Sequence, residues 1–278
     1  MVFLLLAILS SSMISIMMRV SSNRTSANFS VLATNYFVCS VLGAAFAGFE
    51  LVTPQIPGFS VTVWLGMLSG VLYLAGLVSM QTNTGKHGIV LSSVFMKLGL
   101  LVPVVMSVLV FREVPTASQI AGFAIAICAI VLIHGKQENA GKGFGFGLIG
   151  MLLLSGGADA MAKFFEALAP ASLSSLYLFY TFFTAFMLCM IPVLRKKERP
   201  GVRELLYGTL IGIPNFFSAK FLLGALGSLP AVAVYPSFSV GTILVVTLAG
   251  VAVFRERLRR GQWIALAGIL VALILLNI

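Results

Sequence analysis

The sequence predicts an all-α integral membrane protein whose ten transmembrane helices form two inverted five-helix repeats. Three observations lead to this fold class: long apolar runs, few charges and a motif that occurs twice. Hydrophobic residues make up 59% of the 278 residues and charged residues only 9%, whereas soluble domains carry about 25% charged residues. So much apolar surface is expected to lie in lipid, where about 20 apolar residues span the hydrocarbon as a helix.

Ten apolar runs are long enough to be considered as membrane spans. They occupy residues 2–18, 29–49, 60–81, 88–111, 116–134, 146–166, 172–194, 204–224, 230–254 and 262–277. The runs are continuous and lack the apolar–polar alternation of a membrane β-barrel, so we interpret them as helices. The polar connections between them are short, which leaves almost no chain for a soluble domain.

A repeated motif predicts that the chain is a duplication. Phe-Arg-Glu occurs at 111–113 and again at 254–256, and a glutamine follows each copy at positions 119 and 262. The copies are 143 residues apart (254 minus 111), and the same offset aligns apolar positions such as Leu132 and Leu275. Self-similarity at a fixed offset is typical of duplicated architectures. We expect a first repeat at 1–134, a connecting loop at 135–145 and a second repeat at 146–278.

The basic residues predict the orientation in the membrane. Fourteen of them follow the first, third, fifth, seventh and ninth runs: Arg19, Arg24, Lys86, Lys136, Lys142, Arg195, Lys196, Lys197, Arg199, Arg203, Arg255, Arg257, Arg259 and Arg260. The opposite loops hold Arg112 and little else. Because short loops rich in Lys and Arg stay in the cytoplasm, both termini are expected outside it. Five helices per repeat is an odd number, so the second repeat is expected to be inverted. The net charge of +10 therefore reflects membrane orientation and not nucleic-acid binding.

The sequence indicates neither an enzyme nor a metal or cofactor site. It contains no P-loop, nucleophile elbow or glycine-rich dinucleotide fingerprint. Cys39, Cys128 and Cys189 are isolated in different runs, and His87 and His134 lack zinc-like spacing. No basic residue precedes the first apolar run, so we expect a retained helix and not a cleaved signal peptide.

Charges within the predicted helices are candidate substrate contacts, because each costs about 2.5–3.5 kcal/mol to insert. Lys97 lies about ten residues into its run, roughly 15 Å from the start of the helix, and either faces a cavity or bonds to carbonyls. Lys220 lies near a helix end and either binds substrate or snorkels to the interface. Asp159 and Lys163 are four residues apart and either form an ion pair that neutralises both charges or act separately. In the second case, Asp159 takes part in proton coupling or binds a substrate amine.

Polar residues beside prolines complete the candidate site. Tyr235, Ser237 and Thr242 lie around Pro236, and Asn215 follows Pro214. Proline frees carbonyls that can face a cavity; alternatively, the hydroxyls bond back to their own helix. The predicted substrate-binding residues are Lys97, Asp159, Lys163, Asn215, Lys220, Tyr235, Ser237 and Thr242. Gly66, Gly70, Gly76 and Gly241 are instead expected to permit close helix packing.

The duplicated Phe-Arg-Glu, with Gln119 and Gly122 leading into an apolar helix, resembles the signature that closes each half of EamA-type carriers of the drug/metabolite transporter superfamily. The resemblance extends over essentially the whole chain, although the second copy has Ala265 where the first has Gly122. It implies a central cavity between the repeats and alternating access. Related small multidrug carriers use a glutamate in the first helix. This chain has only serines there, which argues against their mechanism.

The expected function is secondary transport, as an exporter or exchanger, of a small polar metabolite such as an amino acid or organic anion. Three embedded lysines against one embedded aspartate favour a substrate with a carboxylate or phosphate. The alternatives are a drug or amine exporter and a lipid-handling membrane protein without solute flux. We expect a bacterial-type inner membrane protein, monomeric or homodimeric, whose partners are a small-molecule substrate and membrane lipid.

Overall fold

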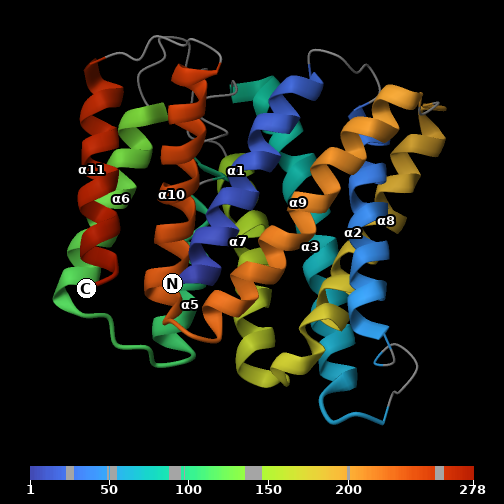
Figure 1. Cartoon of the computed structure of the whole chain (residues 1–278), viewed down its shortest axis with the longest axis horizontal. Helices are drawn as coiled ribbons and strands as arrows, with labels where there is room; N and C mark the ends of the chain where they lie inside the picture. Colours follow the sequence, from blue (N-terminus) through green and yellow to red (C-terminus); the bar gives the residue numbers. More distant parts are fainter. Residues whose placement is uncertain are drawn as a thin grey trace. The chain divides into compact units, whose positions relative to one another are not determined.

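The computed structural model describes residues 1–22, 28–48, 50, 55–87, 95–96, 98–134, 146–198, 201–253 and 260–278 (Figure 1). Every regular element in these ranges is a helix, which confirms the all-α prediction. The α-helices are α1 (Val2–Ser22), α2 (Asn28–Ala47), α3 (Phe59–His87), α5 (Leu101–Leu109), α6 (Ala117–His134), α7 (Phe146–Leu168), α8 (Ser174–Arg195), α9 (Val202–Leu226), α10 (Ala231–Ala252) and α11 (Arg260–Leu276). A short 3₁₀ helix, η2 (Ala171–Leu173), precedes α8.

Seven of these helices are long and apolar enough to cross a membrane, as expected of a multi-pass membrane protein. They are α1, α2, α3, α7, α8, α9 and α10. The other predicted spans also contain described helices, but α5 has nine residues, and the apolar parts of α6 and α11 are also shorter than a span. The predicted loop at 135–145 lies outside the described residues.

The fourth predicted run is not one uninterrupted helix in its described part. Phe95, Met96 and Leu98 are helical, Gly99 and Leu100 form a turn, and α5 begins at Leu101. The amide of Gly99 donates to the carbonyl of Met96 at 3.2 Å, and the amide of Val102 donates to that of Gly99 at 2.9 Å. These tight local bonds explain how the chain passes through the turn without leaving these backbone groups unpaired.

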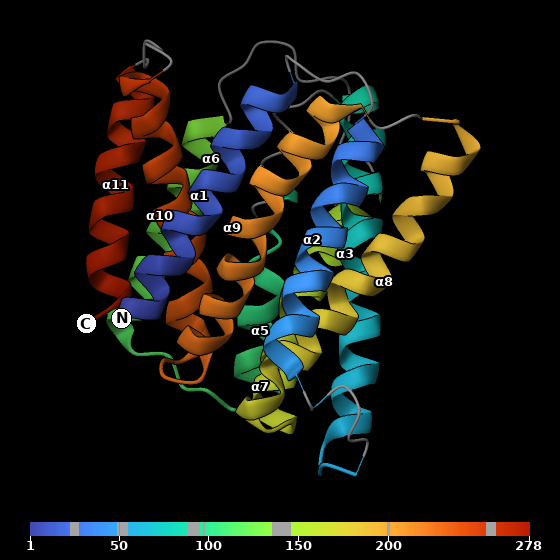
Figure 2. The same ribbon diagram turned by 45° about the vertical axis from the view of Figure 1, so that its right-hand side comes forward.

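The helices form two compact units, and each unit takes helices from both predicted repeats. Unit 1 comprises residues 1–74 and 161–228, and unit 2 comprises residues 75–160 and 229–278. In unit 1, α2 contacts both α8 and α9, and α1 contacts α9; Figure 2 shows α1 and α9 side by side. In unit 2, α6 and α11 pack together and α10 contacts both.

Glycines let the backbones of unit 1 approach closely. A Cβ on Gly66 of α3 would lie 2.8 Å from the carbonyl oxygen of Tyr177 on α8, and one on Gly212 of α9 would lie 2.9 Å from that of Asn35 on α2. Real Cβ atoms essentially never approach within 3.0 Å of another heavy atom. The prediction of close packing is therefore confirmed for Gly66 and Gly70. A Cβ on Gly76 would make only ordinary contacts, at 3.5 Å from Ser155, and the role of Gly241 stays a prediction.

Two glycine pairs of unit 1 make matched contacts. Gly66 and Gly70 meet the carbonyls of Tyr177 and Thr181, and Gly208 and Gly212 meet those of Val31 and Asn35. Within each pair, the glycines and the carbonyls they meet are both four residues apart. The two glycine pairs are separated by 142 residues of sequence (208 minus 66). The two sets of carbonyls that they meet are separated by 146 residues (177 minus 31). Helix α3 thus packs on α8 as α9 packs on α2.

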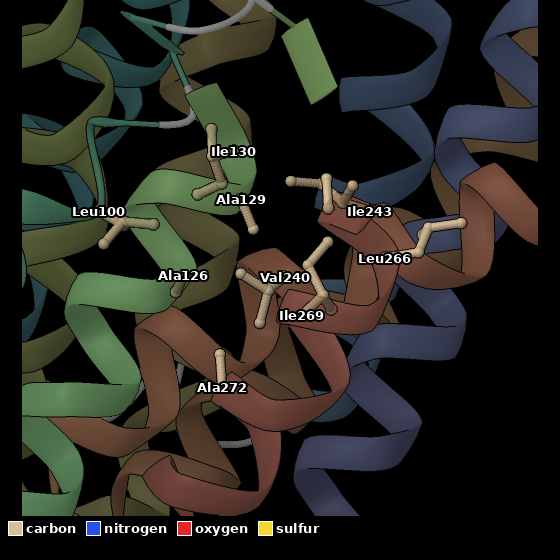
Figure 3. Close-up of a cluster of buried hydrophobic side chains, with 10 residues drawn as sticks. Leu100, Ala126, Ala129, Ile130, Val240, Ile243, Leu266, Ile269 and Ala272 are labelled. Atoms are coloured by element: carbon tan, nitrogen blue, oxygen red, sulfur yellow. The ribbon is translucent and has the colours of Figure 1, made fainter. Parts of the chain in front are cut away.

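Unit 2 has an apolar core formed by Leu100 and by helices α6, α10 and α11 (Figure 3). Its buried members are Leu100, Ala126, Ala129, Ile130, Val240, Ile243, Ala265, Leu266, Ile269 and Ala272. Alanines on α6 and α11 let these helices lie close together, and the larger aliphatic residues fill the space around them. Val240, which the repeat aligns with Lys97, is fully buried in this core.

The first copy of the repeated motif holds two helix N-termini in unit 2. Glu113 Oε2 accepts a hydrogen bond of 3.3 Å from the amide of Val232 in the first turn of α10, where a negative charge is favourable. At the start of α6, Gln119 Oε1 accepts from the Thr116 amide at 3.1 Å, and Thr116 Oγ1 accepts from the Gln119 amide at 3.2 Å. This reciprocal pair is a capping box, so the motif has a structural task.

The glycine contacts lead to a first prediction. Replacing Gly70 by alanine places a methyl group against the Thr181 carbonyl and 2.8 Å from Thr184 Cβ. We expect the free energy of unfolding to fall by about 1–3 kcal/mol, as for other overpacked sites. Gly150 of α7 is the matched control, because an added Cβ there meets nothing within 4 Å. Melting in detergent is the measurement, and a Gly70→Ala protein as stable as Gly150→Ala would contradict the packing argument.

Candidate functional site

Three helices of unit 1 converge on the ammonium group of Lys220. Lys220 lies in α9 and is half-buried. Its Nζ donates to Ser175 Oγ at the start of α8, at 3.1 Å. The same nitrogen lies 3.8 Å from the centre of the Phe46 ring on α2 and 5.8 Å from that of Phe216. A cation over an aromatic face is attracted by the ring quadrupole, so the site holds its positive charge away from bulk water.

A carboxyl group lies near this ammonium. Glu50, three residues beyond α2, is half-buried, yet its Oε2 is buried and has no hydrogen-bond partner within the described part of the chain. Burial raises the pKa of the Glu50 carboxyl above its ordinary value of 4.5, and the nearby Lys220 ammonium acts in the opposite direction. A buried acceptor without a donor is costly. This oxygen is therefore suited to bind a proton or to accept a hydrogen bond from a bound molecule.

Aromatic rings extend from the Lys220 ammonium along α9. Phe46 stacks on Phe216 at 5.5 Å between ring centres, and Phe216 meets Phe217 edge-on at 5.5 Å. Phe217 in turn stacks on Phe221 at 5.8 Å, and Phe221 on Phe3 of α1 at 6.4 Å. These separations are those of favourable aromatic pairs. The row gives the Lys220 ammonium apolar and well-packed surroundings.

Asn215 belongs to a second polar group between α2 and α9. Its Nδ2 donates to Asn35 Oδ1 at 3.1 Å, and both side chains are buried. Asn35 Oδ1 also lies 3.8 Å from the Cys39 thiol, which donates to the Gly212 carbonyl at 3.2 Å. Side-chain amides commonly join helices inside membranes. This placement gives Asn215 a role in joining α9 to α2.

The charges on α7 have partners that the sequence did not predict. Lys163 is buried, and its Nζ lies 2.6 Å from Glu166 Oε2. The i, i+4 spacing had singled out Asp159 as a possible partner of Lys163, and the structure shows an i, i+3 pair of Lys163 with Glu166. The carbonyl of Asp159 accepts a hydrogen bond of 2.7 Å from the Tyr235 hydroxyl of α10. Asp159 and Tyr235 are thus brought together in unit 2.

The remaining predicted residues bond within unit 2 or lie outside the described residues. Ser237 is buried, and its Oγ accepts from Asn277 Nδ2 at 3.1 Å. The Thr242 hydroxyl donates to the Phe238 carbonyl of its own helix at 2.7 Å, as the alternative interpretation of these hydroxyls proposed. Lys97 lies outside the described residues. Within the described ranges, no three His, Cys, Asp or Glu residues are grouped as a metal site would require.

The Lys220 group is the best candidate for a binding site, because it offers a cation, a buried acceptor and aromatic walls. Sequence reasoning found Lys220 but missed Glu50 and Ser175. The nearest signal was the i, i+4 spacing of Phe216 with Lys220 and of Phe46 with Glu50. No periodicity joins Ser175 to Lys220, which are 45 residues apart.

Comparison with known proteins supports the fold and leaves the activity open. An uncharacterized protein of Haemophilus influenzae is 24% identical over 277 residues, which cover 95% of this chain and 93% of that protein. The fold is similar to that of a solved structure described as the crystal structure of a protein, with a TM-score of 0.71 and 15% sequence identity. The match covers 99% of this chain and 94% of the chain in that structure. No family model matches the chain.

The Glu50 carboxyl leads to a pH-dependent prediction. Because its pKa is raised on folding, the folded protein binds this proton more tightly than the unfolded chain does. The stability that Glu50 contributes is therefore present below pH 4.5 and is lost as the pH rises through the folded pKa. We expect Glu50→Gln to melt progressively higher than the wild type as the pH is raised from about 4 to about 7.

Glu198 provides a contrasting control for this measurement. Its Oε2 accepts hydrogen bonds from the amide and hydroxyl of Ser30, at 2.9 and 3.0 Å. Glu198→Gln is expected to lower the melting temperature at neutral pH, because charge-assisted bonds are lost. A Glu50→Gln protein that responds to pH as the wild type does would show that Glu50 is not perturbed by burial.

Proposed function

We propose that this protein is a secondary transporter of EamA type that moves a small metabolite bearing a carboxylate or phosphate, amino acids included, by alternating access. The observation that carries the proposal is the ammonium of Lys220, half-buried in a membrane-spanning helix and surrounded by Ser175, Phe46 and the Glu50 carboxyl. Ionisable groups inside membrane spans are expensive and usually mark substrate pathways. A substrate anion would approach the remaining donors of this ammonium.

An inverted repeat of two sets of five helices is part of the proposal. Its support is the matched packing of Gly66 and Gly70 on α8 and of Gly208 and Gly212 on α2, together with the repeated motif. Inverted repeats are common in secondary transporters, because exchanging the conformations of the two halves opens the site to alternate sides.

A second binding group, considered by itself, is proposed within unit 2, around the fourth predicted helix. The turn at Gly99 and Leu100 interrupts the helical residues there, and interrupted helices often carry transporter binding sites. Lys97 lies two residues before this turn in the sequence. We assign it a contact to the substrate anion, and we assign Asp159, with Tyr235 on its carbonyl, to the substrate's polar groups.

Flux into proteoliposomes tests the proposal directly. A panel of amino acids, organic acids and sugar phosphates should include at least one substrate with saturable flux. Saturable flux of amines or lipophilic cations alone would support the drug or amine exporter instead. No flux for any solute, with transfer of labelled lipid between leaflets, would support the lipid-handling alternative.

Lys220 gives the sharpest variant. Lys220→Met is expected to lower flux of the anionic substrate about ten-fold or more, because a hydrogen bond to a charged group contributes about 1.5–3 kcal/mol. Lys196→Met is the matched control: Lys196 also lies over a phenylalanine ring, 4.4 Å from the centre of Phe29, but is exposed at the end of α8. Equal flux in a stably folded Lys220→Met protein would remove Lys220 from the site.

The orientation in a bacterial-type inner membrane is a separate proposal, with both termini outside the cytoplasm. It rests on the fourteen basic residues that follow alternate predicted helices. A reporter that fluoresces only in the cytoplasm should be dark when fused after Ile278 and bright when inserted in the basic loop at 195–203. The reverse pattern would invert the assignment.

A further inference from the structure

An apolar groove of about 310 Å³ lies in unit 2, and none of its lining residues is among those assigned to transport. Val105, Val108 and Leu109 of α5 form one wall, and Ile120 and Phe123 of α6 form another. Pro115 of the connecting loop and Val232 at the start of α10 also line it. The groove is open to the surroundings of the protein and not enclosed in the core.

The rim of the groove is itself exposed and apolar. Val105 is 47% exposed, Leu109 72% and Ile120 57%. In a soluble protein such a surface would mark a partner site, but these side chains belong to a helical membrane protein, where hydrocarbon is the surrounding solvent. A hydrocarbon chain therefore matches both the shape and the chemistry of the groove.

A cation lies on the loop that borders the groove. Arg112 is exposed on the loop that joins Leu109 to Pro115, two residues that line the groove. Its backbone has a positive φ of 54°, which is uncommon for a residue other than glycine. The carboxylate of the neighbouring Glu113 accepts a hydrogen bond from the Val232 amide, whereas the side chain of Arg112 is exposed.

The lining of the groove is apolar throughout. Gln119 belongs to it through its apolar atoms, and its Oε1 accepts a hydrogen bond from the Thr116 amide at 3.1 Å. The groove therefore offers contacts to a hydrocarbon chain, and Arg112 on the bordering loop offers the charge that a headgroup phosphate requires.

We propose that this groove is a binding site for an anionic phospholipid, with an acyl chain along α5 and α6 and the phosphate at Arg112. The guanidinium fork matches phosphate oxygens in geometry and charge. The proposal commits to a lipid and not to a free anion, because the apolar groove would contribute nothing to binding inorganic phosphate.

Native mass spectrometry of the detergent-purified protein, titrated with phosphatidylglycerol or phosphatidylcholine, tests the site. The wild type should prefer phosphatidylglycerol, and Arg112→Gln should lose about five-fold in its affinity, the effect expected of one basic residue near an anionic lipid. Arg203→Gln, which removes another exposed arginine at the start of α9, should keep the preference. Inorganic phosphate should not compete at the concentrations that saturate the lipid.

Filling the groove provides the second arm. Val105→Trp or Ile120→Trp should reduce binding of both lipids, because the indole occupies the acyl-chain space. Val114→Trp is the matched control, since Val114 is 90% exposed on the same loop and does not line the groove. Melting temperatures verify that each variant is folded.

The outcomes separate this proposal from the transport proposal, because no arm measures flux. A phosphatidylglycerol preference that survives Arg112→Gln, or groove-filling variants that bind lipid as Val114→Trp does, would overturn the lipid site. Competition by inorganic phosphate alone would reassign Arg112 to a soluble anion.

Discussion

Close approach of helix backbones is the constraint on which the rest of unit 1 depends. Lipid removes the hydrophobic force between helices, so their association relies on van der Waals contact and interhelical hydrogen bonds. Gly208 and Gly212 bring α9 against α2 at distances that any side chain would prevent. Farther along the same helix, at helical spacing, Asn215 reaches Asn35 and Lys220 reaches the Phe46 ring. The polar and charged contacts therefore belong to the same α2–α9 interface as the glycine contacts.

The repeated motif marks the architecture and carries no information about the substrate. Glu113 fixes the first turn of α10, and Gln119 with Thr116 fixes the first turn of α6. Both tasks satisfy backbone amides that would otherwise lack partners at helix ends. These tasks are structural and involve no ligand. A resemblance that rests on the motif therefore predicts a fold and says nothing of what the protein binds.

The sequence predicted apolar helices because hydropathy is a local property, and seven of the ten predicted spans are long enough in the described residues. It also marked the close contacts of Gly66 and Gly70, but not those of Gly208 and Gly212. It did not single out Glu166, which pairs with Lys163. Ser175 reaches Lys220, and Asn35 reaches Asn215, across 45 and 180 residues of chain. Such pairings depend on which helices pack together, which local patterns do not encode. The turn at Gly99 interrupted a run that hydropathy presented as one continuous helix.

Some residues occur at equivalent positions in both halves of the sequence and make packing contacts, whereas the embedded charges occur in one half alone. The glycine pairs of α3 and α9 occur in both halves and make the same contacts. The embedded charges do not: the repeat aligns Lys97 with Val240, which is buried in an apolar core, and the offset of the glycine pairs aligns Lys220 with Val78. A scaffold requires equivalent packing from both halves. Under the transport function proposed above, a substrate would have no such symmetry, so the groups that recognise it would need to occur only once. The charges present in one half alone would then be the residues on which specificity depends.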